Sequence, residues 1–423
     1  MTTVAGQPNA QQSRPMSART KNIRLLSLSD QGGRPDGVQV MVHKGHAFVG
    51  HMFSNGISVI DVRDPRKPKP TAFVPMPPNT RSHHIQVHGD LLLAVNAPNV
   101  WAMQQYSQAS TYSSQSMADS FEDRSQTFAA GLRTYDISNP QAPREISFMP
   151  IEGLGLNRIW WVGGRYAYIS VHMEGFTDHI MAAIDVSVPE RPTLAGRWWL
   201  PGMWRAGGEQ ETAPKGKRYA AHHSIVAGNI AYGAWRNGGL SMHDVTEPAN
   251  AKSLSHFVLS PPFSGATHSP LPLPDRNLVV VADEPTAPGC ADGSPHIWIF
   301  DVSVPERPIP ISTLPIPEDD DFCAKGAKFG PHNLHENRPG SLAKSDLIFA
   351  TYHNAGLRVY DIANAFQPKE IAFYVPPAPE RIMDPRPNTP KVVQSCDVFV
   401  DAEGLIFMTD ANAGLHVLQY EGA

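Results

Sequence analysis

One phrase recurs along the chain and constrains its fold more than any other feature. Each copy joins an apolar stretch, an aspartate and a turn: GISVIDVRDPRKP (56–68), GLRTYDISNPQAP (131–143), MAAIDVSVPERP (181–192), GLSMHDVTEPANA (239–251), HIWIFDVSVPERP (296–308) and GLRVYDIANAFQP (356–368). A shorter copy, GLHVLQYEG (414–422), ends the series. Repetition of one unit is typical of architectures in which every copy forms the same small piece of structure.

Apolar stretches of strand length surround each copy. In the first repeat, VQVMV and HAFVG precede the phrase and KPTAFVPMP follows it. The 40 prolines and 33 glycines fall between such stretches, which indicates many short strands joined by turns. Four strands in each of seven repeats predict an all-β fold, a seven-bladed β-propeller.

The seventh copy lacks an outer strand, whereas NIRLLSLSD (22–30) has the pattern of one. We predict that this N-terminal segment completes blade seven, because an open ring would leave exposed strand edges. Residues 1–20 are expected to be a disordered tail and residues 21–423 a single propeller.

An aspartate precedes the turn in six copies, and its carboxylate can accept backbone N–H groups of that turn. We interpret these six residues as structural: Asp61, Asp136, Asp185, Asp244, Asp301 and Asp361.

The repeated phrases resemble the LVIVD-repeat family of bacterial β-propellers over roughly residues 37–420. That resemblance implies the fold but leaves the function open, since propellers support many unrelated activities.

Histidines recur near the start of the innermost strands. Counting back three residues from the last apolar residue of each innermost strand selects one position per blade, namely Gln39, His84, Ile159, His223, His268, His332 and Asp397. Innermost strands converge on the axis of a propeller, and gathered neutral imidazoles are usual ligands of transition metals. We predict a metal site formed by His84, His223, His268 and His332. If the count is wrong by one residue, His83 would take the place of His84, or His222 that of His223. His335 is an alternative ligand to His332.

Other candidates lie on the loops above this position. The insertion at 96–130 in blade two, rich in Ser and Gln with interspersed aromatic residues, is expected to be a lid over the channel. Rim residues include His51, Glu174, Trp235, Arg236, Asp283 and Asp410. The residues predicted to orient ligands or to act as acid or base are Asp397, Glu284, His172 and His353.

The predicted function is that of a metal-dependent oxidoreductase acting on a small apolar or aromatic molecule, with iron expected first and copper, manganese or zinc as alternatives. The plan is similar to that of carotenoid cleavage oxygenases, which are four-histidine iron propellers, and of the selenium-binding-protein group of methanethiol oxidases. In carotenoid cleavage oxygenases, glutamates orient the ligating histidines. In this chain we expect Asp397 and Glu284 to take that role. A metal-dependent lyase or hydrolase, favoured by Gln39, and a non-catalytic scaffold for protein binding remain alternatives.

Composition excludes other classes. The net charge is −5 without a basic block, so we expect no nucleic-acid partner. Because apolar runs stay short of 18 residues, we expect no membrane partner. Cys290, Cys323 and Cys396 are odd in number and far apart, which argues against a disulfide framework and predicts a cytoplasmic protein. The oligomeric state is not predicted.

Overall fold

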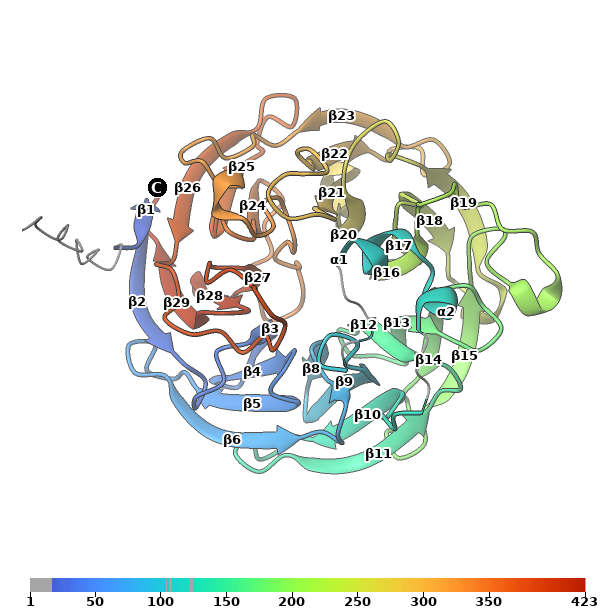
Figure 1. Cartoon of the computed structure of the whole chain (residues 1–423), viewed down its shortest axis with the longest axis horizontal. Coiled ribbons are helices and arrows are strands. Elements are labelled where there is room, and N and C mark those ends of the chain that lie inside the picture. Colours follow the sequence, from blue (N-terminus) through green and yellow to red (C-terminus); the bar gives the residue numbers. More distant parts are fainter. Residues whose placement is uncertain (1–16, 104, 106–108, 122–124, 423) are drawn as a thin grey trace, which may run out of the picture.

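The computed structural model describes residues 17–103, 105, 109–121 and 125–422. Its strands form a ring of antiparallel sheets around a central axis (Figure 1). The predicted all-β propeller fold is therefore confirmed. Residues 1–16 of the predicted tail lie outside the described residues. The predicted end of the tail at residue 20 is wrong, because a strand already begins at Arg19.

Blades one to three each place four strands in chain order from the axis outward. Blade one contains β3 (Gly37–His43), β4 (His46–His51), β5 (Gly56–Asp61) and β6 (Lys69–Pro75). Blade two contains β8 (Ile85–His88), β9 (Leu91–Pro98), β10 (Gly131–Asp136) and β11 (Arg144–Pro150), with β7 (Thr80–Arg81) also paired to β9. Blade three contains β12 (Gly155–Trp160), β13 (Tyr166–His172), β14 (Ile180–Asp185) and β15 (Thr193–Trp198).

Blades four and five share one hydrogen-bonded sheet only because Arg236 of the former pairs with Thr267 of the latter. Blade four contains β16 (Tyr219–Ala227), β17 (Ile230–Arg236), β18 (Leu240–Asp244) and β19 (Lys252–Phe257). Blade five contains β20 (Ala266–Leu273), β21 (Leu278–Glu284), β22 (Ile297–Asp301) and β23 (Ile309–Thr313).

Blades six and seven are completed by the N-terminal segment. Blade six contains β24 (Leu347–Thr351), β25 (Leu357–Asp361) and β26 (Lys369–Val375), and blade seven contains β27 (Ser395–Val400), β28 (Leu405–Asp410) and β29 (Gly414–Tyr420). The strand β2 (Ile23–Ser29) pairs with β29, as predicted, and β1 (Arg19–Lys21) pairs with β26. The first described strands thus bridge two blades.

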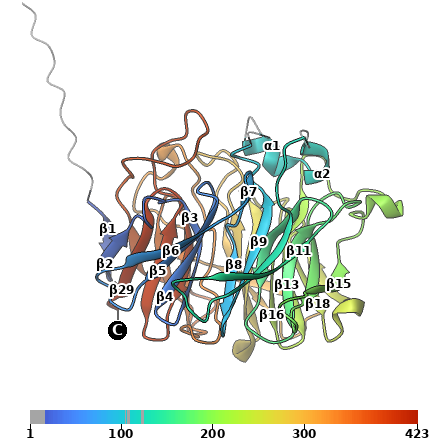
Figure 2. The ribbon, with the colours of Figure 1, turned by 90° about the horizontal axis from the view of Figure 1, so that it is seen from below.

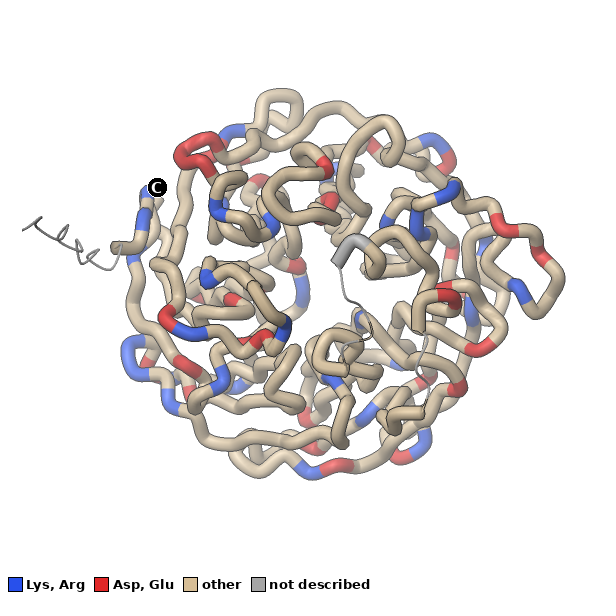
Figure 3. The backbone as a smooth tube through the Cα atoms, viewed as in Figure 1, with Lys and Arg blue, Asp and Glu red and all other residues tan. Residues whose placement is uncertain are grey.

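The core lies between the faces of neighbouring blades. One buried cluster joins blades one and seven through Phe48 and Val59 on one side and Phe407 and Val417 on the other. Charged residues of both signs are distributed around the ring and its turns (Figure 3).

The six repeated aspartates have the predicted structural role. In every case one carboxylate oxygen accepts the backbone N–H of the residue two positions later, at 2.8–3.1 Å. This contact fixes the turn between the third and fourth strands of the blade.

The cysteine prediction is wrong for one pair. Cys290 and Cys323 form a disulfide between two loops, and Cys396 is a buried free thiol. Because disulfides persist in oxidising compartments, the expected cytoplasmic location loses the support that the cysteines gave it.

The insertion in blade two covers one face of the ring. Its first residues, 96–98, still belong to β9, so the lid begins later than predicted. Two short helices, α1 (Ala109–Ser114) and α2 (Met117–Ser120), lie above that face (Figure 2), with α1 beside the central axis (Figure 1). Residues 104, 106–108 and 122–124 of the predicted lid lie outside the described residues.

Contacts with blade three and the start of blade four hold the lid. The backbone N–H of Met117 donates to Asp178 at 3.0 Å, and Arg218 donates to the carbonyl of Tyr112 at 3.0 Å. A small apolar cluster packs residues of the lid itself, including Met103 and Phe121, against Leu154 of blade three. Among the described helices, none has the length and apolarity needed to cross a membrane.

Candidate metal centre

The innermost strands are irregular where they approach the axis. Pairing shifts register between Tyr219 and His223 in β16 and between Thr267 and Ser269 in β20. In blade six the innermost segment is reduced to isolated bridges on either side of His332. Such irregularities redirect side chains from their normal alternation. They decide which histidines meet.

Four imidazoles from blades four, five and six form a continuous series. Ring centroids lie 3.6 Å apart for His222 and His268, 4.5 Å for His268 and His332, and 4.6 Å for His332 and His353. All four side chains are buried. Residues far apart in the sequence therefore meet at one place on the axis.

Hydrogen bonds to backbone carbonyls fix the tautomers of two of these rings. Nδ1 of His222 donates to the carbonyl of His268 at 3.0 Å, and Nδ1 of His332 donates to that of Cys396 at 2.6 Å. In both rings the lone pair is left on Nε2, the form in which imidazole binds metals. Nδ1 of His268 lies 2.9 Å from the Ser269 hydroxyl, which can act as donor or acceptor.

Glu284, at the end of β21, adds a carboxylate to this group. One ligand atom each from His268, Glu284 and His332 lies within 4.8 Å of the other two. Lys328 donates to Oε1 of Glu284 at 2.6 Å. Burial alone would raise the pKa of Glu284, but Lys328 and its other neighbours outweigh burial and hold that pKa well below its ordinary value.

The imidazoles are neutral at physiological pH. Burial, together with neighbouring cations, lowers the pKa of His222 and of His268 well below the ordinary value and that of His332 to about 3. Neutral rings offer lone pairs to a metal without competition from protons.

Two of the four predicted metal ligands, His268 and His332, belong to this group, and two do not. His223 directs Nε2 to Glu336 at 2.8 Å, and its place is taken by His222. His84 contacts His83, with ring centroids 4.2 Å apart and the ring planes tilted by 51°. The register shift in β16 places His222, and not His223, in the imidazole series, and the count along the sequence could not locate that shift.

The rival ligand His335 is engaged in hydrogen bonds with the backbone. Its Nε2 donates to the carbonyl of Leu342 at 2.8 Å, and its Nδ1 accepts the N–H of Val400 at 3.1 Å. Both ring nitrogens are therefore used within the protein.

The four predicted catalytic residues divide in the same way. Glu284 and His353 lie at the imidazole series, with Nε2 of His353 3.8 Å from Oε1 of Glu284. His172 instead accepts the N–H of Leu154 at 3.2 Å. Asp397 accepts the N–H of Val40 at 3.1 Å, and burial raises its pKa to about 7.

Rim residues of blades one, four and five make hydrogen bonds within their own blade. His51 contacts Asp36 and Ser58, the Trp235 indole donates to Ser241 at 2.6 Å, and Asp283 accepts the indole N–H of Trp298 at 2.8 Å.

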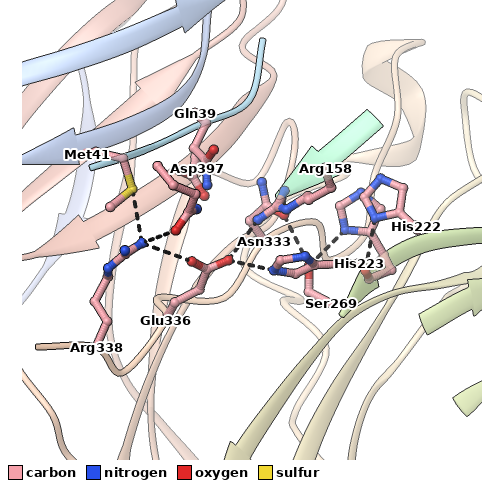
Figure 4. A network of polar contacts seen from close by, with 12 residues as sticks. Gln39, Met41, Arg158, His222, His223, Ser269, Asn333, Glu336, Arg338 and Asp397 are labelled. Carbon is pink, nitrogen blue, oxygen red and sulfur yellow. Dashed lines mark hydrogen bonds and ion pairs between the residues drawn. The ribbon is translucent and has the colours of Figure 1, made fainter. Parts of the chain in front are cut away.

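A buried charge network lies beside His222 and His223 (Figure 4). Glu336 contacts Arg158 at 3.1 Å and His223 at 2.8 Å and lies 3.7 Å from Arg338. Arg338 also donates to Gln86 and to the carbonyl of Trp161, both at 2.6 Å. Sequence reasoning missed Glu336, because its segment is not a strand and carries no periodic signal.

Comparisons with known proteins agree with the fold. The putative 6-phosphogluconolactonase of Bacteroides fragilis is 10% identical, with a TM-score of 0.52 and coverage of 81% of this chain and 85% of that one. The periplasmic gluconolactonase PpgL of Pseudomonas aeruginosa is 11% identical, with a TM-score of 0.52 and coverage of 81% and 86%. Sqt1 of Saccharomyces cerevisiae is 10% identical, with a TM-score of 0.52 and coverage of 91% and 96%. No curated protein matches the chain.

The class of protein is thus a β-propeller. The sequence model of the LVIVD repeat matches residues 158–198, which are almost all of blade three. The phrase that this match contains recurs in the other blades.

Proposed function

We propose that this propeller is a metal-dependent enzyme. His268, His332 and Glu284 supply the three nearest donors for the ion, and His222 supplies the fourth. The observation that carries this proposal is the convergence of ligand atoms from His268, Glu284 and His332 within 4.8 Å of one another, with Nδ1 of His332 and of His222 donating to backbone carbonyls so that their Nε2 lone pairs are available.

Three neutral nitrogens and one carboxylate suit iron, copper, manganese and zinc. Iron comes first, because this donor set with an open coordination position suits a redox ion, and the reaction is then the oxidation of a small molecule held between the ion and the lid. The orienting groups differ from those expected: backbone carbonyls and Ser269, not carboxylates, hold the imidazoles.

A lyase or hydrolase is the second candidate, and Asp397 is the observation that favours it. A carboxyl whose pKa is raised to about 7 is matched to general acid or base catalysis at neutral pH. Such an enzyme would use manganese or zinc. In both cases the partner is a small molecule, without nucleic acid or membrane.

Metal analysis of the purified protein tests the assignment. We expect about one equivalent of a transition metal per chain, lost in His268→Gln and in His332→Gln. The matched control is His243→Gln, which replaces a buried histidine outside the imidazole series and should retain the metal.

Iron or copper together with dioxygen uptake would support an oxidoreductase, and manganese or zinc without it would support the second candidate. Failure of all four metals to bind after loading would refute both and favour a scaffold.

A further inference from the structure

Two buried side chains beside the candidate metal ligands have hydrogen-bonding atoms that the protein leaves unsatisfied. Arg236 ends β17 in blade four, and His353 follows β24 in blade six, so they flank Glu284 of blade five. Each is only 5% exposed. Nε of Arg236 and both ring nitrogens of His353 make no hydrogen bond within the described part of the chain. Buried groups of this kind normally have a partner.

Both residues also adopt a backbone conformation that side chains other than glycine rarely take. The φ angle is +50° at Arg236 and +43° at His353. Such strain persists where the surrounding structure imposes it, and it clusters at ligand sites. Here it occurs on both neighbours of one carboxylate.

The charges beside Glu284 do not balance. Lys328 lies 2.6 Å and Arg236 3.7 Å from its two carboxylate oxygens, so two cations face one anion. Lys328 forms a close ion pair with Glu284, so the charge of the more distant Arg236 is less fully compensated. A further negative charge next to Arg236 would compensate it.

The lid closes this place from above. The ring centroid of Tyr112, in α1, lies 5.5 Å from Cζ of Arg236 and 4.5 Å from Cζ of Arg218. Arg218 is already paired with Asp178 through two contacts, at 2.7 and 2.9 Å. Arg236 therefore remains as the guanidinium that can turn to a ligand beneath the aromatic ring.

We propose that Arg236 and His353 bind an oxyanion group of the substrate, a carboxylate or a phosphate, beneath Tyr112 and next to the metal. The guanidinium presents N–H groups in the geometry that such oxygens accept, and neutral His353 adds one N–H. This substrate class rests on the proposed function, since it places the anion beside the candidate ligands of the ion.

Calorimetric titration of the full-length protein, as purified and after metal loading, tests the site. The probes are benzoate and inorganic phosphate, which separate a carboxylate from a phosphate ligand. We expect one probe to bind once per chain. Arg236→Gln should weaken binding by about 10- to 100-fold, the effect of losing a charged hydrogen bond, and His353→Phe should weaken it too. The control Arg133→Gln removes an arginine paired with Glu145 outside the channel and should not alter binding.

Metal content and thermal midpoint are measured on the same samples. If neither probe binds to folded protein, or if Arg236→Gln and His353→Phe bind like the unchanged protein, the oxyanion site is refuted, whereas a retained metal leaves the proposed function intact. If no metal binds but Arg236→Gln still weakens binding of the probe, the oxyanion site is supported and the proposed metal-dependent function is refuted.

Discussion

Replacing Glu336 by glutamine would remove the carboxylate at the centre of the buried charge network while keeping the size of the side chain. Glu336 is 8% exposed and Arg158 is 1% exposed, so water cannot take over the lost interaction. The glutamine would present an NH₂ group to donors and leave Arg158 and Arg338 without the carboxylate that they share. Breaking a buried pair on one side costs about 3–5 kcal/mol. We expect the free energy of unfolding to fall by that amount.

The assay is denaturant unfolding followed by tryptophan fluorescence. Glu145→Gln is the matched control, because Glu145 forms a partly exposed pair with Arg133 at 2.7 Å and its loss should cost at most about 1 kcal/mol. Equal midpoints for the two variants would refute the reasoning, since they would mean that the network carries no more stability than a surface pair.

Two further predictions concern stability. Burial lowers the pKa of His416 to about 4. As pH falls from 6.5 toward 4, this histidine is therefore protonated in the unfolded chain but not in the folded chain, and the free energy of unfolding decreases in that range. His416→Gln should reduce the loss between pH 7.5 and 4.5 by about 2–3 kcal/mol in denaturant titrations, and an unchanged loss would contradict it. The Cys290–Cys323 disulfide closes a loop with a sequence separation of 33, so Cys290→Ser with Cys323→Ser should destabilise the protein by roughly 3–4 kcal/mol. Thiol titration of the unreduced protein should detect one thiol, and only after denaturation; three would show that the bond is absent.

Much of the fold could be predicted because strand patterns are local. The copies of the repeated phrase define where strands and turns fall, and the missing outer strand of blade seven pointed directly to Ile23–Ser29. The pairing of β1 with β26 carried no such signal, since Arg19–Lys21 is short and polar.

The candidate site was predicted less completely, for reasons that differ by residue. His268 and His332 were found because their blades repeat, but His222 and His223 are adjacent, and only the register shift in β16 decides between them. Glu336 lies in an irregular segment that periodicity does not describe. The partner of Cys290 could not be read from spacing, because two loops of different blades must first be brought together.

The pairing of β2 with β29 constrains how the ring is assembled during synthesis. β2 is synthesised long before its partner β29, with Ser29 opposite Leu415 and Ile23 opposite Tyr420. Until β29 has been made, blade seven has an open edge and β2 lacks this partner. A folding intermediate without β29 would leave both edges available for pairing with other molecules.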